Sequence, residues 1–577
     1  MKFDLETKKN IDQWLQEDYD TATKTEIKKL LEISPETLAD AFYTHLQFGT
    51  GGLRGIMGVG TNRMNGYTVR QATQGLANYL LKLYASPSIF IGFDSRLRSE
   101  EFAKEAAKVL ASNGIRVYLG QDIRPSPWVS FGCRYKKCQA AIMITASHNP
   151  PEYNGYKVYW EDGAQILPPH DKNILAEINL ISDLKQVKNS ALLDDPLIVK
   201  VGQEIDEVYL NAIAHLQIDP DLNRKKGNIL KIVYSSLHGT GITLVPKALR
   251  QAGFPQIFFV ESQIMPDGLF PTLNTPNPEE RSALKLGVER LKEVQADLLI
   301  ATDPDADRVG VAVHHQNEVH FLNGNQIACL CLEYILAKKE LPSNATFIKT
   351  IGTTELFRAI CQAYHRQCVD VLTGFKYIAE KIREWERDPK GPQFIFGGEE
   401  SYGYLIGTET RDKDAVTASV LIAEVALSAK SQSKTLIDLL HDLYKKYGFY
   451  KEILVTLTFK DSKEGKEQME KGMEKLRRES PKTLAGIEIL CIEDYLSSQK
   501  KNLSTGCQEP LELPKSNVLR FHLRDGSTLM IRPSGTEPKI KIYCGVTKKT
   551  YESLASADEV CEKQAQALSK ALEQILL

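Results

Sequence analysis

The sequence predicts an α/β protein of several domains, and two observations support this. The first is a feature that occurs three times, in residues 140–151, 296–308 and 394–403: a short apolar run stops abruptly in a polar loop. An apolar run too short for a helix is typical of a buried strand, and α/β proteins place ligands where such strands end. The second is the length of 577 residues, which exceeds what one core can organise and favours about four domains.

Composition excludes several classes of function. The hydrophobic fraction is 42%, the charged fraction 25% and the net charge −2, so there is no basic surface for nucleic acid and no polybasic membrane anchor. No apolar run approaches the ~20 residues of a transmembrane helix, and residues 1–10 lack the apolar segment of a secretory signal. Ten dispersed cysteines without zinc-site spacing indicate reduced thiols in a cytoplasmic protein.

Residues up to about 46 are expected to be helical, with Ser34-Pro35 as one helix start. The loop at residues 48–55 then holds four glycines and Arg54. Glycines let backbone amides approach a ligand closely, and a guanidinium can meet a phosphate with two hydrogen bonds. An ordinary structural turn is the alternative interpretation of this loop taken alone.

Residues 89–119 read as strand, helix and strand, with Ser99 capping the helix, which is a βαβ unit. It leads to the strand that ends at Ser147. No Gly-x-Ser-x-Gly elbow surrounds this serine. His148 is expected to diverge from it in an extended turn. A hydroxyl without a base can instead carry a phosphoryl group, provided that a cation and positive side chains lie near. A plain strand-ending turn is the alternative.

Residues 154–159 are expected to return as a strand beside the Ser147 strand, which brings Lys157 near the serine. The neighbours of Lys157 are aromatic and apolar, and such burial makes an ammonium usable as an acid or base. The irregular residues 180–197 lead to a domain boundary near Gly202.

The second unit has strands at residues 230–234 and 257–260 and ends in a strand that runs into Asp303, Asp305 and Asp307. On an extended backbone, alternate side chains share a face, and three carboxylates there repel one another unless a hard cation lies among them. The spacing does not fit an EF-hand, because Arg308 replaces the required glycine. Three protein oxygens leave Mg²⁺ positions for a phosphate oxygen and water, and Arg308 adds positive charge; a solvated acidic turn is the alternative.

The third unit begins near Phe321, with helices expected at 326–338, 355–363, 415–429 and 436–447, strands at 346–351, 368–373 and 394–396, and a turn at 373–376. Its last strand ends at Glu399 and Ser401, which are two residues apart and suited to a pair of sugar hydroxyls. A surface turn is about equally compatible with the local sequence. A charged segment with Lys413 precedes the helix at 415.

From about residue 450 the chain is more charged, and strands at 455–459, 518–523 and 528–531 with a hairpin at 524–527 predict an antiparallel sheet. Arg532, Ser534, Gly535 and Thr536 follow. A guanidinium, two hydroxyls and a glycine amide within five residues favour a cradle for a dianionic phosphate over a plain turn. The segment lacks the Walker A pattern.

Taken together, the chain resembles the α-D-phosphohexomutase family over nearly its whole length. The resemblance rests on four motifs in the family's order, which are residues 145–150 (Thr-Ala-Ser-His-Asn-Pro), 303–308 (Asp-Pro-Asp-Ala-Asp-Arg), 398–401 (Gly-Glu-Glu-Ser) and 532–536 (Arg-Pro-Ser-Gly-Thr). Residues 154–159, 373–376 and 401–404 look most like the phosphoglucomutase branch that includes phosphopentomutases. Ala415 departs from the glycine that relatives often carry.

The resemblance implies four domains around a central cleft, three of them similar mixed α/β sandwiches and the last α+β. We expect them at 1–202, 203–320, 321–448 and 449–577. It also implies roles. Ser147 resembles the phosphoserine and a ligand of Mg²⁺, together with the three aspartates. Residues around the reacting phosphoryl group would be Arg54, His148, Lys157 and Arg308, with Lys157 the first choice for proton transfer. Substrate-binding positions would be Glu399, Ser401, Thr373, Gly374, Lys376, Lys413, Arg532, Ser534, Gly535 and Thr536.

The implied reaction interconverts glucose 1-phosphate and glucose 6-phosphate through glucose 1,6-bisphosphate. Phosphopentomutase and phosphomannomutase activities are alternatives within the family, since pentose and hexose phosphates share the group that moves. A magnesium-dependent sugar phosphatase and a non-catalytic sugar-phosphate sensor are alternatives from other classes. The expected partners are small sugar phosphates, with no nucleic acid and no membrane, and the sequence does not define the oligomeric state.

Overall fold

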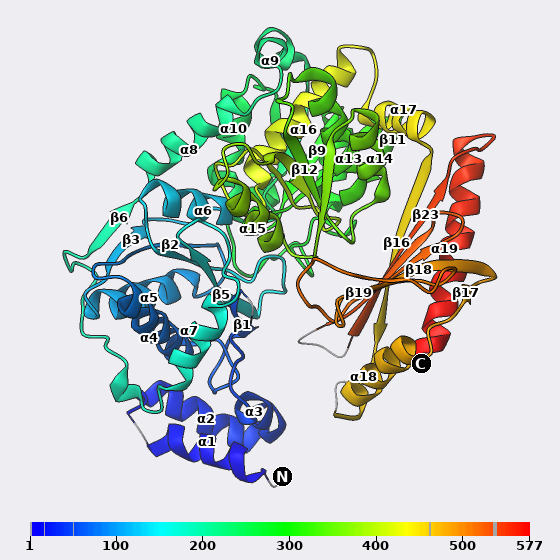
Figure 1. Cartoon of the computed structure of the whole chain (residues 1–577). Coiled ribbons are helices and arrows are strands. Elements are labelled where there is room, and N and C mark those ends of the chain that lie inside the picture. The colour runs from blue at the N-terminus through cyan, green and yellow to red at the C-terminus, as the bar shows by residue number, and fades with distance from the viewer. Residues whose placement is uncertain (1–2, 17, 50, 461–462, 535–538) are drawn as a thin grey trace. The chain divides into compact units, whose positions relative to one another are not determined.

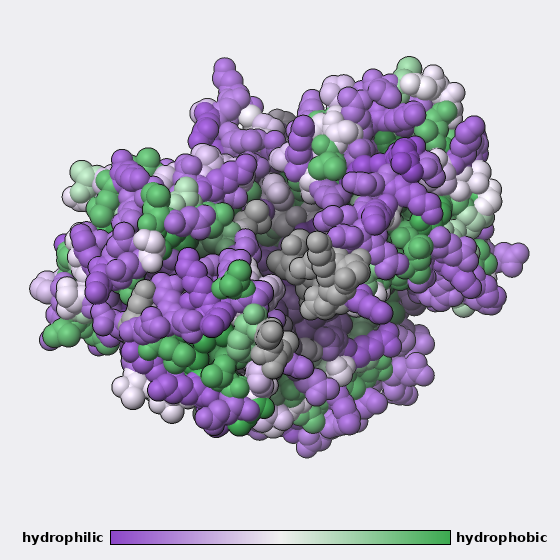
Figure 2. Space-filling model, turned by 90° about the horizontal axis from the view of Figure 1, so that it is seen from below, coloured by the Kyte–Doolittle hydropathy of each residue, from purple (hydrophilic) through white to green (hydrophobic). Residues whose placement is uncertain are grey.

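The computed structural model describes residues 3–577 apart from 17, 50, 461–462 and 535–538. The chain divides into two compact units. The first comprises Met1–Ile327, Ala379–Gly397 and Ser401–Thr435, and the second Ala328–Ile378, Gly398–Glu400 and Leu436–Leu577. No helix in the described part of the chain is long and apolar enough to cross a bilayer. The face drawn in Figure 2 is mostly hydrophilic, with small scattered apolar patches.

Three N-terminal helices form the lead-in that the sequence predicts (Figure 1). They are α1 (Leu5–Gln16), α2 (Thr21–Ile33) and α3 (Pro35–Phe42). Ser34 is the N-cap of α3 and Pro35 opens the helix, as expected. The helices bury a small core of their own, in which Trp14 stacks on Tyr19 with ring centroids 4.2 Å apart.

The first mixed sheet has the strand order β1-β5-β4-β2-β3-β6. Its strands and helices are β1 (Gly52–Ile56), α4 (Gly66–Leu83), β2 (Ser88–Phe93), α5 (Ser99–Ser112), β3 (Arg116–Gly120), α6 (Ser126–Tyr135), β4 (Ala140–Ile144), β5 (Tyr153–Trp160), α7 (His170–Asn179) and β6 (Ile198–Val201). β2 pairs in parallel with β3 and β4, which confirms the βαβ unit, and β5 runs antiparallel to β4, as predicted.

One helix cap in this domain differs from the prediction. Arg98, with φ of 63°, is the N-cap of α5, and Ser99 is the first helical residue. The Ser99 hydroxyl donates to Asp94 Oδ1 at 2.7 Å. The expected cap was wrong because the serine binds the carboxylate at the end of β2 instead of its own helix.

The second mixed sheet has the order β11-β10-β9-β7-β8. Its elements are α8 (Gln203–His215), α9 (Pro220–Lys226), β7 (Ile232–Ser235), α10 (Val245–Gln251), β8 (Ile257–Phe259), α11 (Glu261–Ile264), α12 (Lys285–Glu293), β9 (Leu298–Thr302), β10 (Val309–His315) and β11 (Glu318–Leu322). β9 lies parallel to β7 and antiparallel to β10. Because β11 pairs with β10, this sheet continues two residues past the expected boundary at 320.

The third domain contains the helices predicted at 355–363 and 436–447 with the same bounds. Its elements are α13 (Gly324–Lys338), β12 (Ala345–Thr350), α14 (Glu355–Ala363), β13 (Gln367–Val371), α15 (Phe375–Trp385), β14 (Gln393–Gly398), β15 (Tyr404–Ile406), α16 (Ala415–Lys430) and α17 (Leu436–Tyr447). β12 and β13 pair in parallel. The turn expected at 373–376 is confirmed for Thr373 and Gly374, which form a bend with φ of 124° at Gly374, whereas Phe375 and Lys376 already belong to α15.

The last domain is built on an antiparallel sheet with the order β16-β23-β22-β21-β18-β19-β20, as the sequence predicts. Its elements are β16 (Phe449–Thr458), α18 (Lys463–Arg478), β17 (Thr483–Leu484), β18 (Ile487–Asp494), β19 (Gln499–Asn502), β20 (Gln508–Pro510), β21 (Leu519–Leu523), β22 (Thr528–Pro533), β23 (Lys539–Lys548) and α19 (Leu554–Leu576). The hairpin at 524–527 joins β21 to β22. α18 and α19 were not predicted; α19 lies along β16 and β23 (Figure 1).

Candidate active site

Ser147 stands in the turn after the fully buried strand β4. Its backbone has φ of 53°, and its N–H donates to the Thr145 hydroxyl at 2.8 Å. Arg96 donates from Nη2 to the Ser147 carbonyl at 2.7 Å and is itself buried beside Asp94. The turn is therefore held by the loop that follows the neighbouring strand β2.

His148 does not diverge from Ser147, so that expectation was wrong. Its Nδ1 lies 3.2 Å from Ser147 Oγ. The positive φ of Ser147 curls the chain into a left-handed turn, whereas side-chain divergence requires an extended backbone. Partial burial and the nearby guanidiniums of Arg308 and Arg54 hold the pKa of His148 well below its ordinary value, which favours the neutral ring.

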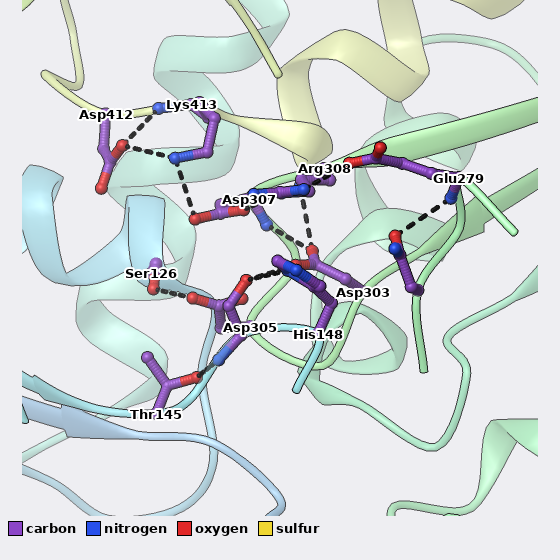
Figure 3. A network of polar contacts seen from close by, with 12 residues as sticks. Ser126, Thr145, His148, Glu279, Asp303, Asp305, Asp307, Arg308, Asp412 and Lys413 are labelled. Carbon is purple, nitrogen blue, oxygen red and sulfur yellow. Dashed lines mark hydrogen bonds and ion pairs between the residues drawn. The ribbon is translucent and has the colours of Figure 1, made fainter. Parts of the chain in front are cut away.

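The three aspartates follow β9 and converge, though not by the route expected from the sequence. The loop is a turn instead of an extended segment: the Ala306 N–H donates to the Asp303 carbonyl at 2.9 Å, and Ala306 has φ of 47°. One carboxylate oxygen from each aspartate lies within 4.8 Å of the others. All three residues are at most 1% exposed, and Figure 3 shows them at the centre of a polar network.

Ser147 and this acidic loop meet, although they are 156 residues apart in the chain. Ser147 Oγ donates to Asp303 Oδ2 at 2.9 Å. The other oxygen of Asp303 accepts the backbone N–H groups of Asp307 and Arg308 at 3.0 and 2.9 Å. The serine hydroxyl thus contacts the acid group directly.

In Asp305 and Asp307, one carboxylate oxygen contacts donors of the protein, and the other oxygen has no donor among the described residues. Asp305 Oδ2 accepts from Ser126 Oγ and from Lys157 Nζ, both at 2.7 Å. Asp307 Oδ2 lies 3.2 Å from both Lys157 Nζ and Lys413 Nζ. Among the described residues, the buried Oδ1 atoms of Asp305 and Asp307 have no hydrogen-bond partner.

This donor set fits a hard divalent cation. Buried carboxylate oxygens without donors are costly unless an ion or water satisfies them. Burial and the charges of Asp307 and Asp305 raise the pKa of Asp303 well above its ordinary value. Oxygen ligands from closely spaced carboxylates are those that Mg²⁺ takes, so Asp303, Asp305 and Asp307 could hold a metal ion.

Lys157 and Lys413 are the cations nearest this group. Lys157 lies on β5 opposite Met143 of β4. Burial opposes its charge, but Asp305 and Asp307 outweigh burial and raise the pKa of Lys157, so it is an ammonium here and not a base. Lys413, expected among substrate residues, contacts Asp307 and, at 3.3 Å, Asp412 Oδ1.

Arg54 and Arg308 differ in their surroundings. Arg54 is exposed on β1 and donates to Asn149 Oδ1 at 3.2 Å, which brings it beside the Ser147 turn. Arg308 forms an ion pair with Glu279, and its Nε lies 3.9 Å from Asp307 Oδ1. Figure 3 shows Lys413 and Arg308 on either side of Asp307.

The predicted sugar-binding residues fall mainly in the second unit. The Gly374 N–H donates to Glu399 Oε1 at 2.9 Å, and Glu399 is 4% exposed. Beside it, the buried Thr373 hydroxyl has no partner among the described residues. Lys376 follows at the start of α15, with Nζ 5.2 Å from the Tyr377 ring. Ser401 belongs to the first unit.

The predicted phosphate cradle is described only in part. Arg532 lies on β22 opposite Lys541 of β23, and the Ser534 N–H donates to the Lys539 carbonyl at 2.8 Å. Gly535 and Thr536 lie outside the described residues. Arg532 and Ser534 thus lie at the carboxyl end of β22, next to the first residue of β23.

Several residues of the network were missed from the sequence, namely Arg96, Ser126, Glu279 and Asp412. Asp412 accepts from the Tyr159 hydroxyl and from Gln165, both at 2.9 Å, as well as from Lys413. A usable signal existed for Arg96, because it follows a buried strand in a polar loop as Ser147 does. Ser126, Glu279 and Asp412 carry no comparable local pattern.

The fold and the site define a class: a four-domain α/β protein with a serine hydroxyl held against a buried group of carboxylates. Models of the phosphoglucomutase/phosphomannomutase family match the chain in four parts. They describe alpha/beta/alpha domain I at residues 45–185, domain II at 207–316, domain III at 323–447 and the C-terminal domain at 462–563.

Curated relatives agree with these matches. The chain is 36% identical over 519 residues to a phosphoglucomutase of Staphylococcus haemolyticus, covering 89% of this chain and 92% of that one. It is also 36% identical over 523 residues to a phosphoglucomutase of Staphylococcus epidermidis, covering 90% and 94%. The chain therefore belongs to the phosphoglucomutase/phosphomannomutase family, the α-D-phosphohexomutases, which confirms the resemblance and the predicted fold class.

Solved structures share the fold at low sequence identity. A phosphoglucomutase/phosphomannomutase family protein of Burkholderia thailandensis has a TM-score of 0.67 at 18% identity, covering 92% of this chain and 97% of that one. Parafusin, a phosphoglucomutase of Paramecium, has a TM-score of 0.67 at 17% identity, covering 92% and 96%.

Proposed function

We propose that this protein is a phosphoglucomutase, which interconverts glucose 1-phosphate and glucose 6-phosphate through a phosphoserine at position 147 and glucose 1,6-bisphosphate. One observation carries the proposal. A buried serine hydroxyl donates to Asp303 at 2.9 Å, at the edge of a group of three buried carboxylates. A phosphoryl group on this oxygen would lie beside any cation that the carboxylates hold.

The cation in the proposal is Mg²⁺, held by Asp303, Asp305, Asp307 and an oxygen of phosphoserine 147. When bound, it supplies charge neutralisation for the transferring phosphoryl group. His148 Nδ1 lies 3.2 Å from Ser147 Oγ, Arg308 donates its N–H to Asp303, and Arg54 reaches Asn149 in the Ser147 turn. These side chains add donors for the phosphoryl oxygens, which is the positioning and charge stabilisation that phosphoryl transfer requires.

The reaction has two transfers. In the first, the oxygen of a sugar hydroxyl bonds to the phosphorus, the bond from phosphorus to Ser147 Oγ breaks, and Ser147 Oγ ends as a hydroxyl. In the second, Ser147 Oγ bonds to the other phosphorus of the bisphosphate, and the departing sugar oxygen ends as a hydroxyl. We assign proton transfer to Lys157: in each step its ammonium gives a proton to the departing oxygen and regains one from the attacking hydroxyl.

Substrate recognition is proposed for two further groups. Glu399, with Thr373, Gly374, Lys376, Ser401 and Lys413, would bind sugar hydroxyls. The phosphate that is not transferred would bind Arg532, Ser534, Gly535 and Thr536. In this proposal the four domains keep the bounds expected from the sequence, except that the second extends to Leu322 with β11. The cysteines are all free thiols, which supports the cytoplasm as the location.

The alternatives differ in their products. A phosphopentomutase or phosphomannomutase would use the same serine and carboxylates, and kcat/KM on glucose, mannose and ribose 1-phosphates separates these three. A sugar phosphatase would release inorganic phosphate, and a sensor would bind without turnover. Neither requires both a serine at the acid group and a second binding group on another domain.

The test is a coupled assay for glucose 6-phosphate formed from glucose 1-phosphate, run with detection of free phosphate. Wild type should form glucose 6-phosphate with little free phosphate, and Ser147→Ala should lose at least about 1,000-fold in kcat, since the variant lacks the oxygen that carries the phosphoryl group in this mechanism (each 1.36 kcal/mol is tenfold). Ser130→Ala removes another buried serine hydroxyl of the same domain and should retain turnover. Full activity in Ser147→Ala would refute the mechanism.

A further inference from the structure

Ser126 makes two hydrogen bonds to one metal-site residue. It is the first residue of α6 and is fully buried. Its hydroxyl donates to Asp305 Oδ2 at 2.7 Å, and its backbone N–H donates to the Asp305 carbonyl at 2.8 Å. Asp305 lies 179 residues away, in the turn after β9 of the second sheet, so these bonds join the first domain to the acidic loop (Figure 3).

The bond from the Ser126 hydroxyl fixes which carboxylate oxygen of Asp305 faces the protein. Lys157 also donates to Oδ2, at 2.7 Å, so this oxygen has two donors. Oδ1 has no partner within the described part of the chain, although it is buried. A carboxylate rotates easily about its last bond, and only donors on one oxygen hold it in a single orientation.

An ordinary helix cap does not explain this arrangement. A serine that caps a helix accepts a backbone N–H of its own helix with its oxygen. Pro125 stands at the N-cap of α6, and the structure gives it no side-chain cap bond. The Ser126 hydroxyl instead donates its hydrogen bond to a carboxylate of another domain.

We propose that Ser126 is a positioning residue for the cation site. Its hydroxyl orients the Asp305 carboxylate so that Oδ1 is left for the cation. Its N–H, which donates to the Asp305 carbonyl, keeps the acidic loop in place beside the first domain. The inference rests on the proposed function, because it takes the three aspartates as the metal ligands. Ser126 does not touch the substrate or the cation in this account.

The experiment compares Ser126→Ala, Ser126→Thr and Ser130→Ala in the full chain, with Mn²⁺ as the probe ion and electron paramagnetic resonance as the readout. Ser130 lies one turn further along α6; its hydroxyl donates to the Gly163 carbonyl at 2.6 Å and accepts the Arg411 N–H at 2.8 Å, so its partners lie outside residues 303–308. Loss of a residue that orients a metal ligand typically weakens binding about 10-fold to 100-fold. We expect Ser126→Ala to raise the Mn²⁺ dissociation constant by about 10-fold, while Ser126→Thr and Ser130→Ala stay within about twofold of wild type.

Turnover gives a second readout. Ser126→Ala should need about 10-fold more Mg²⁺ for half-maximal activity, with kcat at saturating Mg²⁺ close to wild type. A wild-type Mn²⁺ dissociation constant in Ser126→Ala would overturn the inference. A Ser126→Thr protein that is folded by circular dichroism yet binds Mn²⁺ about 10-fold more weakly would also overturn the inference. If Ser126→Ala does not fold, Ser126→Thr is the variant that tests the role of the hydroxyl. Absence of mutase turnover in wild type, with normal Mn²⁺ binding, would instead refute the proposed function.

Discussion

Arg520 should be among the most sensitive positions for the stability of the second unit. It lies on β21 and is 5% exposed. Its guanidinium lies 2.8 Å from Glu355, 3.5 Å from Asp370 and 3.8 Å from Glu493. Glu355 and Asp370 belong to α14 and β13 of the third domain, so this cation joins that domain to the last one.

The magnitude follows from what remains after Arg520→Met. Burial opposes the charge of Arg520, but Asp370, Glu355 and Glu493 outweigh burial and raise its pKa. Removing one partner of a buried pair costs about 3–5 kcal/mol, because the other charge is left uncompensated. Lys349 stays 2.9 Å from Glu355 and 3.1 Å from Asp370, so we take the lower end, about 3 kcal/mol.

Calorimetry measures this effect. For a unit of about 200 residues, 1 kcal/mol shifts Tm by about 2–4 °C, so the expected loss is about 6–12 °C. Arg524→Met is the control. Arg524 lies only 2.6 Å from Glu488, but the two side chains are 64% and 44% exposed, and such surface pairs contribute little. Equal Tm values for the two variants would refute the reasoning that burial of an ion pair, and not the distance between its atoms, determines how much stability is lost when the arginine is removed.

Two further outcomes concern Glu452 of β16 and the cation site. Burial raises the pKa of Glu452 from 4.5 to about 7, so the folded state binds this proton more tightly and stability should fall as pH rises through that window. Glu452→Gln should remove this loss and stabilise the protein at pH 8 by about 1–3 kcal/mol in urea titrations; an unchanged pH profile would contradict the burial argument. Mg²⁺ at about 100 times its dissociation constant should stabilise the first unit by about 2.7 kcal/mol, reversed by a chelator, whereas an equal shift in both units would argue against binding at the three aspartates.

The strands and their order along the chain were largely predictable from the sequence. The strands that end at Ser147 and at Asp303 are short apolar runs with turn-forming residues behind them, and both are buried throughout. Local pattern suffices there because a buried strand must be apolar on both faces. The antiparallel sheet of the last domain was found in the same way, since its hairpin carries Asp-Gly between two alternating segments.

Backbone conformation within the loops was not predictable in the same way. Ser147 and Ala306 both adopt positive φ, a state that non-glycine residues rarely take and that sequence does not signal. Extended geometry was therefore assumed for both loops, which misplaced His148. It also gave the wrong reason for the convergence of the aspartates.

The acidic loop shows why partners such as Ser126 escape sequence reasoning. Its backbone is held from three sides: by Ser126 N–H on Asp305 at 2.8 Å, by Thr240 N–H on Pro304 at 2.8 Å, and by Ala415 N–H on Ala306 at 3.2 Å. These donors come from three different domains, and none is near the loop in sequence. Three buried carboxylates repel one another, so the loop alone would not hold them together. The site is thus a property of the assembled first unit, and a fragment that lacked any one of these donors should lose cation affinity before it loses its own sheet.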